Sequence, residues 1–134
     1  MRITTLISLS FSCLLTANVA RAHHAFATEF NVDAPISLEG KVTKVELINP
    51  HSWIHVEVVT DSGDTETWMI EGGSPNALVR RGITKASIPI GSELVIRGYQ
   101  ARDGSLRAVG RDLRFSDGRE LFFQGTRAPD PAGE

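Results

Sequence analysis

Much of the chain alternates apolar and polar side chains with a period of two, which is typical of β-strands with one buried face. The first alternating stretch, residues 36–47, changes its apolar parity at Thr43-Lys44, which predicts a β-bulge. Stretches 52–60 and 64–71 follow, and Asp61-Ser62-Gly63 between them suits a three-residue hairpin loop. The pattern therefore predicts three consecutive strands at the start of the folded domain.

A short helix is predicted after the third strand. Ser74 can cap it, Pro75 suits its first position, and Gly82 suits its end. Turn signals at Asp103-Gly104 and Asp117-Gly118 then divide the rest of the chain into further strands. Three strands, a short helix and two or three more strands is the order of an OB-fold. We therefore expect an all-β fold with one short helix, an OB-fold-like small β-barrel, with a β-sandwich as the alternative.

The amino-terminal end has the pattern of a cleaved secretory signal. Arg2 precedes an apolar run over residues 6–15, and Ala20-Arg21-Ala22 provides a small-residue cleavage site. We therefore expect export to the periplasm. No later apolar run approaches the roughly 20 residues that cross a bilayer, so we expect no membrane span after cleavage. The predicted parts are a signal peptide (1–22), an OB-like domain (23–125) and a disordered tail (126–134).

Charge and cysteine content narrow the classes of partner. The only cysteine, Cys13, lies in the predicted signal, so the mature chain has no disulfide and no thiolate ligand. Residues 23–74 carry a net charge of −7 and residues 75–120 a net charge of +4. These are either two solvated faces, or an acidic half that favours a cation and a basic half that meets an anionic partner. Nucleic acid is not expected as the partner of an exported protein.

The strand 52–60 has an unusual second face. A three-residue hairpin loop places His55 opposite Met69, Trp53 opposite Glu71 and Glu57 opposite Thr67. Directly opposed side chains have Cβ atoms about 4.5–5.5 Å apart. Imidazole and thioether together suit a cuprous ion, so this face is similar in kind to small exported copper chaperones built on OB barrels. Ordinary cross-strand packing is the alternative.

The predicted new amino terminus offers a second route to copper. A terminal His23 can chelate copper(II) through its α-amine and its ring, and His24 can add a further nitrogen. The segment also contains the aromatic residues Phe26 and Phe30, so we expect it to dock onto the domain. A tail that happens to begin with two histidines is the alternative. The candidate metal ligands are His23, His24, His51, His55 and Met69.

Motifs of enzymes are missing from the sequence. It has no nucleophile elbow, phosphate loop, dinucleotide fingerprint or HExxH. We therefore expect a non-enzymatic binding protein, with copper as the first candidate ligand. The alternative is a protein-interaction accessory module, and an enzyme with a copper-bound amino terminus is a third class. The residues of the expected binding face are Trp53, Glu57, Glu71, Arg80 and Arg81.

Four segments resemble a bacterial family of small exported proteins that is known only as a domain of unknown function. The resemblance implies a Gram-negative periplasmic setting and no known catalytic activity. It provides no functional residues. The segments are 23–26 (HHAF), 49–53 (NPHSW), 71–82 (EGGSPNALVRRG) and 98–104 (GYQARDG).

Overall fold

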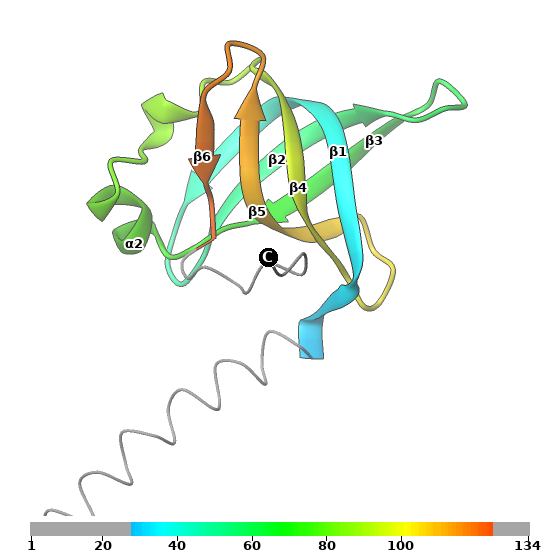
Figure 1. Cartoon of the computed structure of the whole chain (residues 1–134), viewed down its shortest axis with the longest axis horizontal. Coiled ribbons are helices and arrows are strands. Elements are labelled where there is room, and N and C mark those ends of the chain that lie inside the picture. The colour runs from blue at the N-terminus through cyan, green and yellow to red at the C-terminus, as the bar shows by residue number, and fades with distance from the viewer. Residues whose placement is uncertain (1–27, 125–134) are drawn as a thin grey trace, which may run out of the picture.

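The computed structural model describes residues 28–124, which form six strands and one short α-helix (Figure 1). The predicted signal peptide and the predicted tail lie outside these residues. The elements are β1 (Phe30–Leu47), β2 (Ser52–Val59), β3 (Thr65–Glu71), α2 (Pro75–Arg80), the 3-10 turn η1 (Lys85–Ser87), β4 (Glu93–Ala101), β5 (Arg107–Phe115) and β6 (Glu120–Phe122).

The strands form a closed ring. Their order is β3-β2-β1-β4-β5-β6 with antiparallel neighbours, and β5 also pairs with β3 in parallel. The long strand β1 serves both halves of the ring, because it pairs with β2 and with β4. Its register shifts between Val42 and Lys44, which confirms the predicted bulge. The expected all-β fold with one short helix is confirmed, and the β3–β5 pairing closes one sheet instead of separating two layers.

The strand β1 starts at Phe30, earlier than the alternating pattern predicts, because tertiary contacts hold this end. Phe30 is 2 % exposed and pairs with Ala101 on β4. The backbone N–H of Arg102 donates to the carbonyl of Glu29 at 2.9 Å. The buried side chains form a small second cluster, made of Phe30, Tyr99, Ala101 and Val109.

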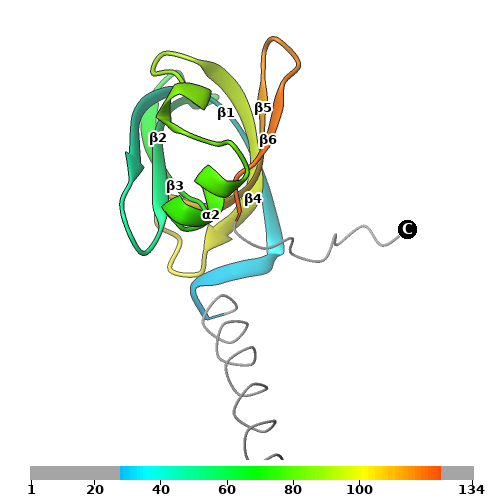
Figure 2. The same cartoon turned by 90° about the vertical axis from the view of Figure 1, so that its left-hand side faces the viewer.

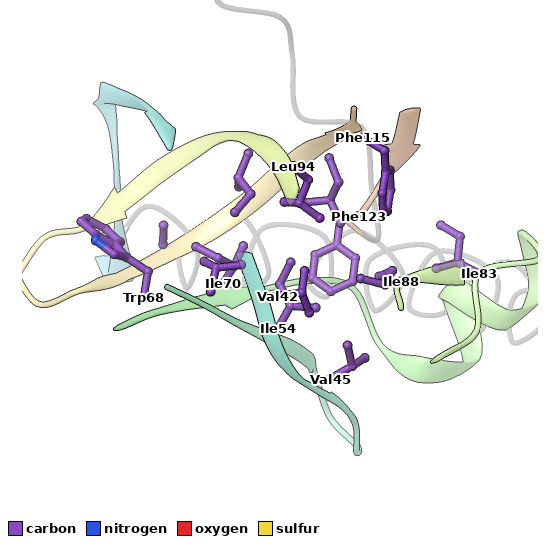
Figure 3. Packing of buried hydrophobic residues seen from close by; sticks show 14 of the residues in the cluster. Val42, Val45, Ile54, Trp68, Ile70, Ile83, Ile88, Leu94, Phe115 and Phe123 are labelled. Carbon is purple, nitrogen blue, oxygen red and sulfur yellow. The ribbon is translucent and has the colours of Figure 1, made fainter. Parts of the chain in front are cut away.

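The main core fills the ring (Figure 3). The segment between β3 and β4 covers one end of it (Figure 2), because Leu78 of α2 and the following Ile83 and Ile88 belong to the core. As predicted, α2 begins after Ser74, whose hydroxyl accepts from the backbone N–H of Ala77 at 3.3 Å. Within the described residues, no helix has the length and apolar character needed to cross a membrane.

Candidate functional site

The hairpin of β2 and β3 has the predicted register. His55 pairs with Met69 and Trp53 pairs with Glu71. The alternate residues Ile54 and Val56 are fully buried in the core, so His55 and its same-parity neighbours lie on the outer face of the ring. The sequence prediction of this cross-strand pair is confirmed.

Strands from both sides extend this outer face. Lys44 of β1 pairs with His55, and Arg107 of β5 pairs with Met69 in the parallel ladder. Four strands therefore contribute to one continuous surface. We call it the His55 face, and its residues are Glu46, His51, Trp53, His55, Met69 and Arg107.

A carboxylate holds the imidazole of His55. Its Nε2 lies 2.8 Å from Oε2 of Glu46, and the ammonium of Lys44 lies 2.8 Å from the other oxygen of Glu46. The hydrogen bonds from Lys44 and His55 lower the pKa of Glu46, which favours the ionised carboxylate. In a neutral imidazole, a carboxylate that accepts from Nε2–H leaves Nδ1 as the ring nitrogen with a lone pair. This is the arrangement in which metal-binding histidines are usually oriented.

A second carboxylate holds His51. Nδ1 of His51 forms an ion pair with Oε1 of Glu71, which is only 6 % exposed. Burial raises the pKa of Glu71, and the charge of His51 opposes this effect. Glu71 lies on the predicted binding face, but it is buried beneath His51. Both histidines of the face are therefore oriented by a carboxylate from a neighbouring strand.

An arginine covers the indole of Trp53. The guanidinium carbon of Arg107 lies 5.7 Å from the ring centroid, and Nη2 of Arg107 pairs with the carboxylate of Glu29. A cation over an indole face is attracted by the ring quadrupole. This contact links the start of the described chain to the centre of the His55 face.

A cavity of about 330 Å³ opens beside Trp53. Most of its wall is apolar, and the exposed Ile48 stands at its edge, with 63 % of its surface accessible. Its size lies at the lower end of the range for small-molecule sites, about 300–1,000 Å³. The lining residues are Glu46, Ile48, Asn49, Pro50, His51, Trp53 and Met69.

The other predicted site residues that the structure describes do not line the cavity. Glu57 is exposed on β2 opposite Thr67. Arg81 lies over the ring of Phe122 and donates to the carbonyl of Ala77, and no residue of α2 lines the cavity. Arg80 is exposed in the last turn of that helix. His23 and His24 lie outside the described residues.

Two residues of the face were missed by the sequence reasoning, for different reasons. Glu46 follows from the bulge, because the changed parity after Lys44 turns it toward the side of His55, and this signal was available in the sequence. Arg107 reaches the face through a parallel pairing of β3 with β5, which no local pattern indicates. Among residues 28–124, the structure contains no group of three or more histidine, cysteine, aspartate or glutamate side chains that could hold a metal ion.

The two carboxylates are expected to affect stability with opposite pH dependence. The pKa of Glu71 is raised from 4.5, so protonated Glu71 makes its full contribution to the free energy of unfolding below pH 4.5. This contribution is lost as the pH rises through the raised pKa. Glutamine does not ionise, so the free energy of unfolding of Glu71→Gln relative to that of the wild type should rise from about pH 4 to about pH 7.5. Urea unfolding at both pH values measures this.

Glu46→Gln is the matched control. The pKa of Glu46 is lowered, so its contribution is present above 4.5 and is lost as pH falls through the lowered value. The variant should be less stable than the wild type near neutral pH, with a smaller difference in acid. The same pH trend in both variants would contradict the assignment of Glu71 as a carboxylate whose burial opposes ionisation.

One family model matches most of the chain. It describes a family of unknown function, DUF6152, and covers residues 12–110. No match to a curated protein is found. The chain therefore belongs to DUF6152, which agrees with the expected uncharacterised family.

Proposed function

We propose that this protein is a non-enzymatic copper-binding protein of the periplasm and that it holds Cu⁺ on the His55 face. The observation that carries the proposal is the direct cross-strand pairing of His55 with Met69. A neutral imidazole and a thioether are soft ligands that favour Cu⁺. The export signal inferred from the sequence supports the periplasmic setting.

The contacts around His55 support a defined role for each neighbour. Glu46 accepts from Nε2–H, so Nδ1 is the nitrogen that would hold the ion, and Sδ of Met69 is the second ligand. Trp53, two residues from His55 on the same face, shields the ion on one side. Additional nitrogen ligands come from His23 and His24 in this proposal. Trp53 lies between His51 and His55 along the chain, so His51 does not share the ion with His55 directly in this proposal. It contributes to copper binding only together with His23 and His24 of the amino-terminal segment.

The experiment is an anaerobic titration of the mature protein with Cu⁺ against a coloured Cu⁺ chelator. We expect one ion per chain with submicromolar affinity. Met69→Leu keeps the size and apolar character of the side chain but removes the sulfur, and it should weaken binding by at least about tenfold. Glu46→Gln should weaken binding by roughly 10- to 100-fold, because the orientation of His55 is lost.

The matched control is Thr67→Ala, since Thr67 lies on the same face of β3 but pairs with Glu57. This variant should bind copper like the wild type. Binding by Met69→Leu that equals the wild type would overturn the proposed ligand set, and no binding of either copper oxidation state would overturn the function.

A protein-interaction module is the second candidate. The apolar wall of the cavity and the exposed Ile48 favour it, because such a hollow suits a side chain of a protein partner. The same titration separates the two candidates, since an interaction surface of this kind needs no copper.

A further inference from the structure

We infer that the cavity beside Trp53 is the docking site for residues 23–27 of this same chain, with the phenyl ring of Phe26 as the anchor. The inference needs no metal, so it stands or fails separately from the copper proposal. It rests on the position of Glu29 near Trp53, on the wall of the cavity and on the sequence of the five residues upstream of Thr28.

The start of the described chain lies close to Trp53, one of the residues that line the cavity. The carbonyl of Glu29 accepts from the N–H of Arg102 at 2.9 Å, and Phe30 is buried in the second cluster. The side chain of Glu29 pairs with Arg107, whose guanidinium carbon lies 5.7 Å from the Trp53 centroid. Since a charge-assisted hydrogen bond spans about 3 Å, the carboxylate of Glu29 lies within about 10 Å of this ring.

The segment is long enough for Phe26 to reach Trp53, which forms part of the cavity wall. Phe26 precedes Glu29 by three residues, which span at most about 10 Å when extended. The short covalent connection also keeps the effective concentration of the segment at the cavity near the millimolar range. An occupant from another molecule would have to compete with this tethered segment.

The chemistry of the segment matches that of the wall. Phe26 and two alanines face an apolar wall to which Ile48, Trp53 and Met69 contribute. The segment has no acidic residue, and Glu46 at the cavity is within hydrogen-bond distance of both Lys44 and His55. Docking would place His23 and His24 next to the histidines of the His55 face.

The test uses the two tryptophans as separate probes. Trp53 is half-buried at the cavity, whereas Trp68 is 7 % exposed in the core and its indole N–H donates to Glu66 at 3.0 Å. In metal-free protein that carries its natural amino-terminal segment, Phe26→Ser should shift the indole N–H resonance of Trp53. It should also roughly double the quenching of Trp53 fluorescence by acrylamide. Trp68 should be unchanged, which reports an intact fold.

Two further variants make the result specific. Phe26→Leu keeps an apolar anchor and should resemble the wild type, and Trp53→Phe identifies the resonance. Equal Trp53 shift and quenching in the wild type and in Phe26→Ser would overturn the inference. Protection of Trp53 that rises with protein concentration would also overturn it, because the occupant would then be a second copy.

The outcome is separable from that of the copper titration. If Phe26→Ser exposes Trp53 but no copper binds, docking holds and the proposed function fails. If copper binds and Phe26→Ser changes nothing at Trp53, the proposed function holds and docking fails.

Discussion

Gly98→Ala is expected to abolish or nearly abolish the folded state. A Cβ on Gly98 would lie 1.9 Å from the carbonyl oxygen of Val109 and 3.0 Å from its carbonyl carbon. Both atoms belong to the backbone of β5, so no side-chain rotation relieves the overlap. The position sits where the β4–β5 register shifts, with Gly98 paired to Gly110. We expect a loss of about 3 kcal/mol or more in the free energy of unfolding, a large part of the stability of a domain this size.

Thermal and urea unfolding of the purified variant measure this loss. Gly104→Ala is the matched control, because Gly104 has a φ of 75° but no atom within 4 Å of an added Cβ. It should cost only the strain of a left-handed residue, about 1–2 kcal/mol. If Gly98→Ala is no less stable than Gly104→Ala, the close approach of β4 and β5 is not as described.

Phe123→Ala is expected to have the second largest effect. Phe123 is fully buried within the main core, and its ring lies against the backbone at Gly72, where an added Cβ would be 2.4 Å from Cε1. Truncation removes a whole aromatic ring and leaves a cavity, which costs about 3–5 kcal/mol. The carbonyl of Phe123 also accepts from the N–H of Gly73, which joins the residue after β6 to the turn that follows β3.

The neighbouring Phe122→Ala is the control for Phe123→Ala. Phe122 is only partly buried and contacts the guanidinium of Arg81, 5.5 Å from its centroid. We expect a loss of about 1 kcal/mol, from partial burial and an exposed cation–π contact. Urea unfolding of both variants compares them directly. A loss in Phe122→Ala equal to that in Phe123→Ala would contradict the described packing of the carboxyl-terminal strand.

The pair of His55 and Met69 could be predicted because its causes are local. The loop at 61–63 fixes the register of the hairpin, and the alternation of Ile54 and Val56 with polar neighbours fixes which side faces the core. Glu46 follows from the same reasoning once the bulge at Thr43-Lys44 is placed. This part of the His55 face can therefore be predicted without knowing how distant strands pair.

Other features of the site depend on contacts between distant segments. Arg107 joins the face because β5 closes the ring against β3. Glu29 is brought to Arg107 because the second cluster extends β1 to Phe30. The burial of Glu71, which raises its pKa, also arises only when these elements pack around it.

The sequence by itself determined the succession of strands along the chain, the short helix, the bulge and the β2–β3 register, because alternation, capping and turn residues act over a few neighbouring positions. The tertiary structure alone decided how the ring closes and which cation covers Trp53. It also decided where the start of the described chain lies. These features depend on pairing and burial between residues far apart in the chain, which a local pattern does not encode.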